Sequence, residues 1–469
     1  MSNGSEVVTS AAPSPASIPN TVTVNAEPWP RPAQAWYAVF VFSLALMVNM
    51  LDRGILTLLV QPIKHDLHLT DVQMGMLMGF AFVLFYLILG LPIARLADSK
   101  TRRNIIAVGV TIWSVMTATC GLAKSFGQLF LCRVGVGSGE SCSGPATFSM
   151  LADLFPKEKL PRAIAVLNFG FYAGTGLALA IGGTLTQAFV NMPPRTLPIV
   201  GTVHGWQLVF FVVGIPGLIV AALLLTVAEP KRRGIAAPHS AELKPPPIGE
   251  VVRFMGQHAG AYVPMFLGMG IQSVMMVGVG SWGPAFFMRT FGWSPGKYGL
   301  TMGALMFTVM PVGAFVGSLV AERFAKKGHD DANMRTVLFS YVLPIPGYLI
   351  FPLMPNPKIA IVIMIYGMFV GSWGGAPMNA ALQSITPNQM RGQVTALFLL
   401  VFNVIGYGLG PSIIAVLTDF VFHSEAQIGR SIAATVAILA PLGISMIWLS
   451  LKPYGRSFAQ ARALELQAT

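Results

Sequence analysis

Twelve apolar stretches run through this chain, and each is long enough to form a helix that crosses a lipid bilayer. The hydrocarbon core of a bilayer is about 30 Å thick, which takes roughly 20 apolar residues in a helix. The stretches cover residues 36–60, 73–96, 104–123, 128–151, 163–188, 207–228, 259–288, 298–321, 335–354, 358–384, 393–419 and 428–451. Only 10% of the residues are charged, against about 25% in water-soluble domains. The sequence therefore predicts an all-α polytopic membrane protein.

The stretches fall into two sets of six, separated by a polar segment. Residues 1–33 are rich in Ser, Pro, Asn and Thr, and predict a disordered N-terminal tail without a cleavable signal peptide. We expect one six-helix bundle over 34–228, a cytoplasmic linker over 229–256, a second bundle over 257–452 and a C-terminal tail over 453–469. The linker contains the run Pro245-Pro246-Pro247, which cannot continue a helix.

The basic residues indicate how the chain is oriented. With both termini in the cytoplasm, the tails and inner loops hold 21 Lys and Arg residues and the outer loops hold 7. Positive residues concentrate on the cytoplasmic side of membrane proteins, so both termini are predicted to be cytoplasmic. The net charge of +12 is spread between spans rather than along one surface, which argues against a nucleic-acid partner.

The two halves resemble each other. Asp98 and Arg102 follow the second span as Glu322 and Lys326 follow the eighth, at an offset of 224 residues. The fourth and tenth spans also share a similar spacing of Gly and Pro. Parallel six-helix repeats predict two pseudo-symmetric bundles with a binding site at the midplane between them.

The fourth span carries two ionisable residues, which are costly in a bilayer and indicate a functional site. Arg133 and Glu140 lie in residues 129–156, which we expect to form one membrane-crossing helix. Seven residues are about two helical turns, so both side chains share a face about 10 Å apart along the axis. In the tenth span the aligned residues are uncharged, so the charge chemistry is predicted to belong to the first half.

The motifs resemble those of the major facilitator superfamily, whose fold has 12 transmembrane helices in two six-helix bundles. ARLADSKTRRN after the second span is similar to its cytoplasmic-loop motif, and RVGVGSGE to its fourth-helix motif. NMLDRGIL in the first span, RVGVGSGESCSGPATFSMLADLFPKEKLPRAIAV and GFYAGTGLALAIGG resemble the Spinster branch, proposed lysolipid and sphingolipid transporters. The resemblance implies a monomeric carrier of a bacterial inner membrane, with the lipid bilayer, protons and a small amphipathic or anionic substrate as partners and no cofactor.

Asp52 and Arg53 lie at a depth in the first span similar to that of Arg133 in the fourth. We expect the two pairs to form one network in which Glu140 and Asp52 couple protons and Arg53 and Arg133 meet the substrate. Carboxylates alternate between ion-paired and protonated forms, whereas arginines keep their charge. The alternative is a permanent cluster of salt bridges that locks the two helices together.

Two gates are predicted at the ends of the spans. The resemblance implies a cytoplasmic gate made by Asp98, Arg102, Glu322, Lys326, Asp153 and Arg162. An outer gate is predicted from Asp71 and Arg289, although helix capping would equally explain Asp71. For the cytoplasmic residues the alternative is a set of solvated loops whose charge sets the topology.

Polar residues within the spans are candidates for the cavity lining, although such residues more often form hydrogen bonds between helices than contacts with a ligand. They are Asn49, Tyr86, Asn168, Tyr172, Gln272, Trp373, Asn379, Asn403 and Tyr407. The three scattered cysteines predict packing rather than a metal site or disulfides, and the histidines form no catalytic motif.

The sequence thus predicts a proton-coupled carrier of an amphipathic anionic lipid rather than an enzyme. A proton-coupled symporter of organic carboxylates is the alternative.

Overall fold

A computed structural model describes residues 29–81, 83, 88–89, 92–93, 100–156, 159–197, 201–232, 246–387 and 389–468. Within these residues, ten helices are long and apolar enough to cross a membrane. The second span is described only in part, and the fourth is divided into two shorter helices. Together they make up the predicted two-bundle, 12-helix architecture.

The first bundle contains eight described helices and a small hairpin. The helices are α1 (Pro32–Leu58), α2 (Val60–Leu67), α3 (Asp71–Met78), α5 (Arg102–Cys120), α6 (Phe126–Glu140), α7 (Ser143–Leu154), α8 (Leu160–Val190) and α9 (Gly205–Thr226). Strands β1 (Arg195–Leu197) and β2 (Gly201–Val203) pair in antiparallel fashion between α8 and α9.

The second bundle follows a short helix, α10 (Ile248–Gln257). Its elements are α11 (Ala259–Phe291), α12 (Pro295–Lys326), α13 (Ala332–Val342), α14 (Ile345–Ile350), η1 (Phe351–Leu353), α15 (Pro357–Gly371), η2 (Ser372–Gly374), α16 (Gly375–Ser384), α17 (Arg391–Val416), η3 (Leu417–Val421), η4 (Glu425–Gln427) and α18 (Ile428–Ala468). The segments predicted as a linker and a C-terminal tail are therefore partly helical, because α10 lies in the first and α18 continues into the second.

The fourth span is not the continuous helix that we predicted. α6 ends at Glu140 and α7 begins at Ser143. Pro145 has no N–H to donate to the carbonyl of Ser141, so the backbone ladder is interrupted at this point. As a result Glu140 is the last residue of α6 and lies next to the interruption between α6 and α7.

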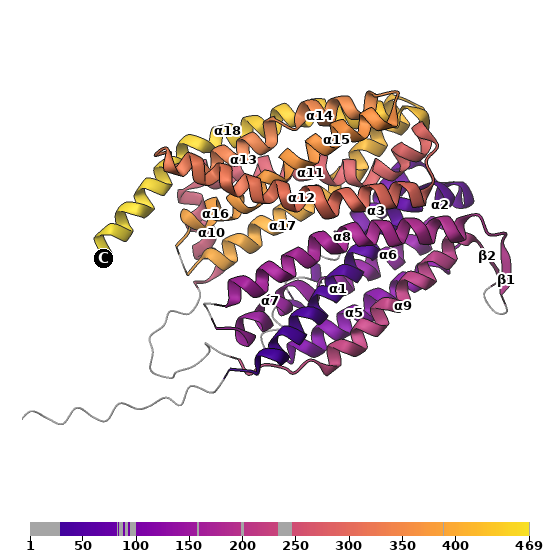
Figure 1. Cartoon of the computed structure of the whole chain (residues 1–469), viewed down its shortest axis with the longest axis horizontal. Helices are drawn as coiled ribbons and strands as arrows, with labels where there is room; N and C mark the ends of the chain where they lie inside the picture. The colour runs from indigo at the N-terminus through magenta and orange to yellow at the C-terminus, as the bar shows by residue number, and fades with distance from the viewer. Residues whose placement is uncertain are drawn as a thin grey trace, which may run out of the picture.

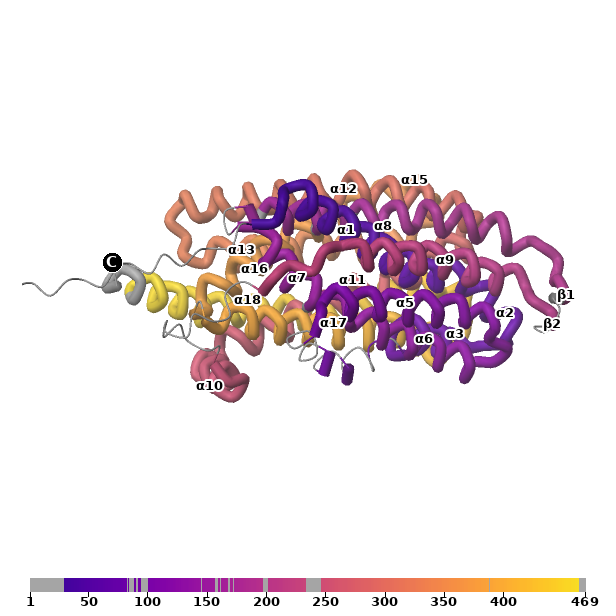
Figure 2. Tube along the Cα trace, turned by 90° about the horizontal axis from the view of Figure 1, so that it is seen from below, coloured from indigo at the N-terminus to yellow at the C-terminus, as the bar shows by residue number. Residues whose placement is uncertain are grey.

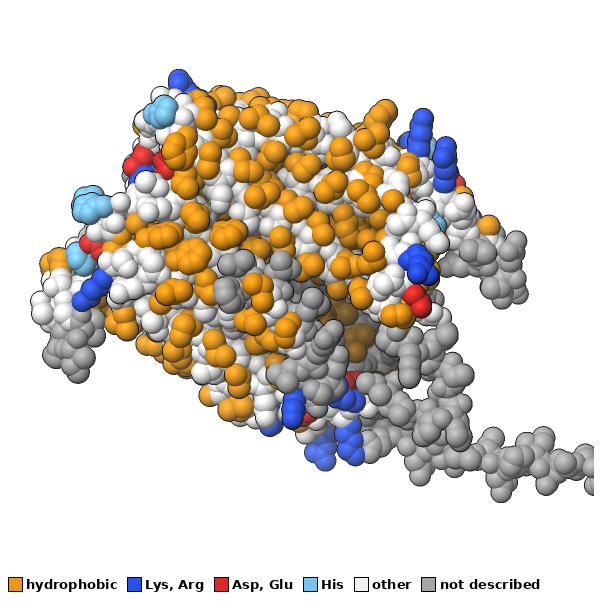
Figure 3. All heavy atoms as spheres, turned by 180° about the vertical axis from the view of Figure 1, so that it is seen from behind, with side chains coloured by type: hydrophobic (Ala, Val, Ile, Leu, Met, Phe, Trp, Pro, Cys, Tyr) orange, Lys and Arg blue, Asp and Glu red, His pale blue; other side chains and the backbone are white. Residues whose placement is uncertain are grey.

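The two bundles lie side by side (Figure 1). α10 and the C-terminus lie at one end, which we call the tail end, whereas α2 and the β1–β2 hairpin lie at the other, which we call the distal end (Figures 1 and 2). On the face seen in Figure 3, hydrophobic side chains cover the middle, and charged side chains lie near the two ends. This distribution is that of a protein whose middle lies in lipid.

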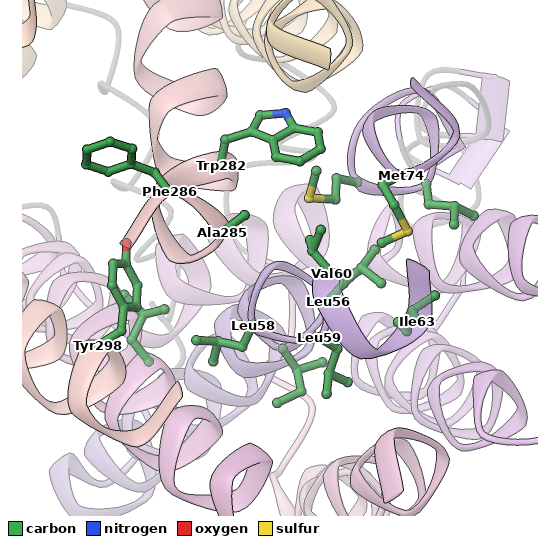
Figure 4. Close-up of a cluster of buried hydrophobic side chains, with 14 of the residues drawn as sticks. Leu56, Leu58, Leu59, Val60, Ile63, Met74, Trp282, Ala285, Phe286 and Tyr298 are labelled. Atoms are coloured by element: carbon green, nitrogen blue, oxygen red, sulfur yellow. The ribbon is translucent and has the colours of Figure 1, made fainter. Parts of the chain in front are cut away.

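One hydrophobic core joins the bundles, and it lies toward the distal end. Leu56, Leu59 and Met74 of the first bundle pack in the same cluster as Trp282 and Phe286 of the second (Figure 4). Two other clusters, which include Ala35 to Val48 and Val251 to Met269, each belong to a single bundle. The shared core therefore ties the bundles together mainly through their distal halves.

Glycines allow the helices of the two bundles to come close in this distal half. A Cβ at Gly299 of α12 would collide with the backbone of Leu179 in α8, and one at Gly303 would collide with the backbone of Gly176. Small residues permit such close approach of membrane helices. The α8–α12 contact is thus a main joint between the bundles.

Candidate functional site

An ion pair between α1 and α6 forms the centre of the candidate site. Arg53 donates to Oε2 of Glu140 through Nε at 2.8 Å, and its Nη2 lies 2.6 Å from the same oxygen. The Glu140 side chain is fully buried and that of Arg53 is 21% exposed. The second oxygen of Glu140, Oε1, is buried without a hydrogen-bond partner among the described residues. Hence one carboxylate oxygen takes both donors, and the other is left available.

Asp52, the residue next to Arg53, takes a different partner. The Thr117 hydroxyl in α5 lies 2.6 and 2.5 Å from the two carboxylate oxygens of Asp52. α5 also packs closely against α6, because a Cβ at Gly109 or at Gly139 would collide with the other helix. The charges of Arg133, Glu140 and Arg53 all act on the Asp52 carboxylate. The other three charges of the predicted network therefore lie within electrostatic reach of Asp52.

Arg133 is the least satisfied of these charges. It is only 2% exposed, and its Nε and Nη1 atoms have no hydrogen-bond partner among the described residues. A buried guanidinium normally has its donors paired, because desolvation without hydrogen bonds is costly. The site therefore contains a cation with two donor atoms that bind no acceptor among the described residues.

The site also reaches the second bundle through an aromatic ring. The guanidinium carbon of Arg53 lies 5.4 Å from the centroid of the Tyr407 ring in α17. At this distance a cation is attracted to the face of an aromatic ring. Arg53 therefore contacts its own bundle through Glu140 and the other bundle through Tyr407.

The other predicted lining residues are placed less distinctively. The indole Nε1 of Trp373 is buried without a partner among the described residues, whereas Asn379 and Asn403 donate to carbonyls of their own helices. Asn49 is buried and Gln272 is partly buried. Tyr86 and the side chains of Asn168 and Tyr172 lie outside the described residues.

A charge cluster closes the distal end between the bundles. Arg289 of α11 donates to both carboxylate oxygens of Asp71, with each distance at 2.7 Å. Lys64 lies 2.6 Å from both Asp71 and Glu425, and the backbone N–H of Val72 donates to Asp419 at 2.8 Å. The sequence predicted Asp71 and Arg289 but missed the other members, because Lys64, Asp419 and Glu425 stood among ordinary loop and span-end charges.

Helix capping does not account for Asp71. Thr70 caps α3 by accepting from the backbone of Gln73, and the Gln73 side chain completes a capping box. The fully buried Asp71 carboxylate instead forms ion pairs with Arg289 and Lys64. Asp71 therefore contributes to the contact between the bundles.

Asp71 stays ionised across the neutral range. Burial alone would raise the pKa of Asp71, which precedes the second apolar stretch, but the hydrogen bonds and charges of Arg289 and Lys64 outweigh burial and lower it. A carboxyl with a lowered pKa contributes its stabilisation above its unfolded pKa and loses it only as the pH falls through the lowered value. Changes near neutral pH therefore leave this contact in place.

We expect Asp71→Asn to separate the bundles at the distal end. Removing one partner from a buried ion pair costs about 3 kcal/mol, which corresponds to more than a hundredfold change in the ratio of closed to open forms. Pulsed electron spin resonance between labels at Asn191 and Ala426 reports the separation. Asp331→Asn, which breaks an ion pair with Arg335 inside one bundle, is the control. Unchanged distances in Asp71→Asn would show that the cluster does not hold the bundles together.

A second cluster lies at the tail end, within the first bundle. Arg102 is buried, forms an ion pair with Asp153, and donates to Glu229 at 2.9 Å and to the carbonyl of Pro230 at 3.0 Å. Glu229 was missed because it stood at the edge of the predicted linker. This cluster ties α5 and α7 to the segment that follows α9.

The remaining residues of the predicted cytoplasmic gate do not join this cluster. Glu322 and Lys326 are exposed on α12 and form no ion pair with any described residue. Arg162 was expected beside Asp153, but its guanidinium carbon lies 5.8 Å from the ring centroid of Trp36. Asp98 lies outside the described residues.

The two helical bundles are joined by a common hydrophobic core at the distal end, and buried ion pairs lie at their contact. This arrangement is that of a membrane transporter rather than an enzyme. The family model described as Major Facilitator Superfamily matches residues 42–411, and the chain belongs to this family. The chain is similar to an MFS-type efflux pump of Mycolicibacterium smegmatis, at 27% identity over 92% of this chain and 95% of the relative. It is also similar to a probable galactarate/D-glucarate transporter of Bacillus subtilis, at 32% identity over 42% of this chain and 41% of the relative.

Among solved structures, the chain resembles a bacterial homolog of the human lysosomal transporter Spinster. That structure is inward-facing and unoccupied, with 25% identity, a TM-score of 0.76, and coverage of 92% of this chain and 99% of the other. The predicted likeness to the Spinster branch is thereby confirmed.

Proposed function

We propose that this protein is a proton-coupled secondary transporter that moves an amphipathic anionic substrate by alternating access. The observation that carries the proposal is the Arg53–Glu140 ion pair together with Arg133, which lies about two helical turns from Glu140 in α6 and has two donor atoms without a partner among the described residues. A permanent structural lock would use those donors, whereas a site for an anion keeps them for its ligand.

The chemistry of the site couples the proton to the substrate. Guanidinium groups stay charged, so only Glu140 and Asp52 exchange protons. When Glu140 takes up a proton, it no longer holds Arg53 as an ion pair. Arg53 and Arg133 then both face an anionic head group, and loss of the substrate lets Glu140 ionise and pair with Arg53 again.

The positions of the two charge clusters support alternating access. With cytoplasmic termini, as the distribution of Lys and Arg favours, the distal end is the outer one, and Asp71 with Arg289 forms the closed outer gate. Glu322 and Lys326, which form no ion pair with the described residues in this conformation, would close the tail end against Asp98 and the Arg102 cluster when the bundles rock. We place the carrier in a bacterial inner membrane as a monomer.

The asymmetry of the site supports the proposed class of substrate. Charges come from the first bundle, whereas the second contributes the Tyr407 ring that faces Arg53. A lysophospholipid or sphingolipid-like molecule, with one anionic head and one apolar tail, matches this division. A carboxylate symporter is the second candidate, since a relative is named as a probable galactarate/D-glucarate transporter and arginine pairs bind carboxylates equally well.

Proteoliposomes with an internal pH-sensitive dye test the proposal. We expect proton movement on addition of a lysophospholipid and none on addition of glucarate, with protein-free liposomes as the control for leakage. The same compounds should raise the unfolding temperature of the purified protein if they bind. Proton movement with glucarate alone would establish the carboxylate symporter, and substrate movement without protons would refute coupling.

A further inference from the structure

An apolar groove of about 300 Å³ lies between α1 and α8 near the tail end. Its walls include Trp36, Leu44 and Met47 of α1 and Val166, Phe169 and Ala173 of α8. Ser43 supplies a hydroxyl group to the lining, and that hydroxyl donates to the carbonyl of Val39 at 2.8 Å. The groove therefore presents almost only hydrocarbon to an occupant.

The groove opens away from the charged site. At 100° per residue, Trp36, Phe40 and Met47 lie on the face of α1 opposite Asp52. Phe40 and Phe169 are 58% and 55% exposed, which places the rim on the surface of the bundle. An occupant would thus come from the surrounding bilayer rather than from the centre of the carrier.

A cation stands at the tail-end mouth of the groove. Arg162 lies one helical turn before Val166 on the same face of α8, and its guanidinium is held over Trp36. Arg162 is exposed and forms no ion pair with the described residues, and the first turn of α8 contains no acidic residue. Tryptophan and basic side chains are typical of the level at which lipid head groups lie.

The length of the groove matches one leaflet. Trp36 and Met47 are eleven residues apart in α1, which is about 16 Å along the helix. This is about half of the roughly 30 Å hydrocarbon core. One lipid can therefore occupy the groove, with its phosphate at Arg162 and its acyl chain ending near Met47.

We propose that the groove binds an anionic phospholipid of the bilayer, with one acyl chain between α1 and α8 and its phosphate against Arg162. This groove is separate from the site proposed for the transported substrate. The proposal of a bound lipid does not depend on the proposed function. Phe169 of the groove wall also meets the Phe307 ring of α12 at 6.2 Å between centroids. A bound chain would accordingly touch the joint between the two bundles.

Thermal unfolding of the purified full chain in neutral detergent tests the proposal. Phosphatidylglycerol is expected to raise the unfolding temperature more than phosphatidylcholine with the same chains, and glycerol 3-phosphate should have no effect. Arg162→Gln should remove the difference between the two lipids. Ala173→Phe, which fills the groove, should remove the shift itself.

Matched variants control for nonspecific effects. Arg462→Gln removes an exposed cation from α18, which continues to the tail end in the other bundle, and Leu177→Phe enlarges an exposed residue of α8 outside the groove lining. Both should respond to phosphatidylglycerol as the unsubstituted protein does. A full phosphatidylglycerol shift in both Arg162→Gln and Ala173→Phe would overturn the proposal, and so would an equal effect of phosphatidylcholine.

Discussion

Replacing Glu140 with glutamine is expected to abolish the dependence of transport on pH while the protein remains folded. Glutamine has nearly the same shape, and its carbonyl oxygen can still accept from Nε of Arg53, but it has no charge and takes up no proton. Coupling between two ligands is typically worth about 1–3 kcal/mol, or roughly 5–150-fold in affinity. We expect a coupling of this size between proton and substrate to disappear in Glu140→Gln.

The measurement is substrate binding and pH-driven transport by the two proteins over the range in which carboxyl groups titrate. Glu229→Gln is the matched control, because it neutralises another carboxylate paired with an arginine, but in the tail-end cluster. It should lower stability without changing the pH dependence. Undiminished pH-driven transport by Glu140→Gln would contradict the assignment and leave Asp52 as the coupling residue.

The sequence was sufficient for the architecture because each span has to satisfy a simple length and hydrophobicity requirement. It was also sufficient to single out Arg53 and Glu140 as candidates, since charges within spans are rare. Hydropathy defines how deep a residue lies but not how its helix is rotated. Consequently the partner of Arg53 could not be derived, nor could the placement of Asp52 against Thr117.

Other features were missed because their residue types are common where they stand. Thr117 is an ordinary small polar residue in a span, and Glu425 an ordinary loop charge, until the fold brings them to Asp52 and Lys64. The break after Glu140 was different, because Pro145 signalled it in the sequence. The sequence alone does not show that the interruption of the helix lies at the residue that pairs with Arg53.

Replacing Arg133 with methionine is expected to remove substrate binding without destabilising the free protein. Methionine keeps an unbranched, flexible side chain and removes a buried charge whose Nε and Nη1 have no hydrogen-bond partner among the described residues. Removing a buried charge that lacks hydrogen-bond partners also removes its desolvation penalty, which is roughly several kcal/mol per ion. The unliganded unfolding temperature should therefore stay the same or rise, whereas the increase on addition of substrate should vanish.

Arg53→Met provides the contrast, because it removes the ion-pair partner of a fully buried carboxylate. Breaking such a pair from one side costs about 3–5 kcal/mol, so this variant should unfold at a clearly lower temperature. Similar behaviour of the two variants would mean that both arginines hold the helices together. If Arg133→Met is stable but no longer responds to substrate, Arg133 binds substrate and Arg53 holds the helices together. Removing a cation that only binds a ligand leaves the stability of the unliganded protein unchanged, whereas removing one that pairs helices lowers it.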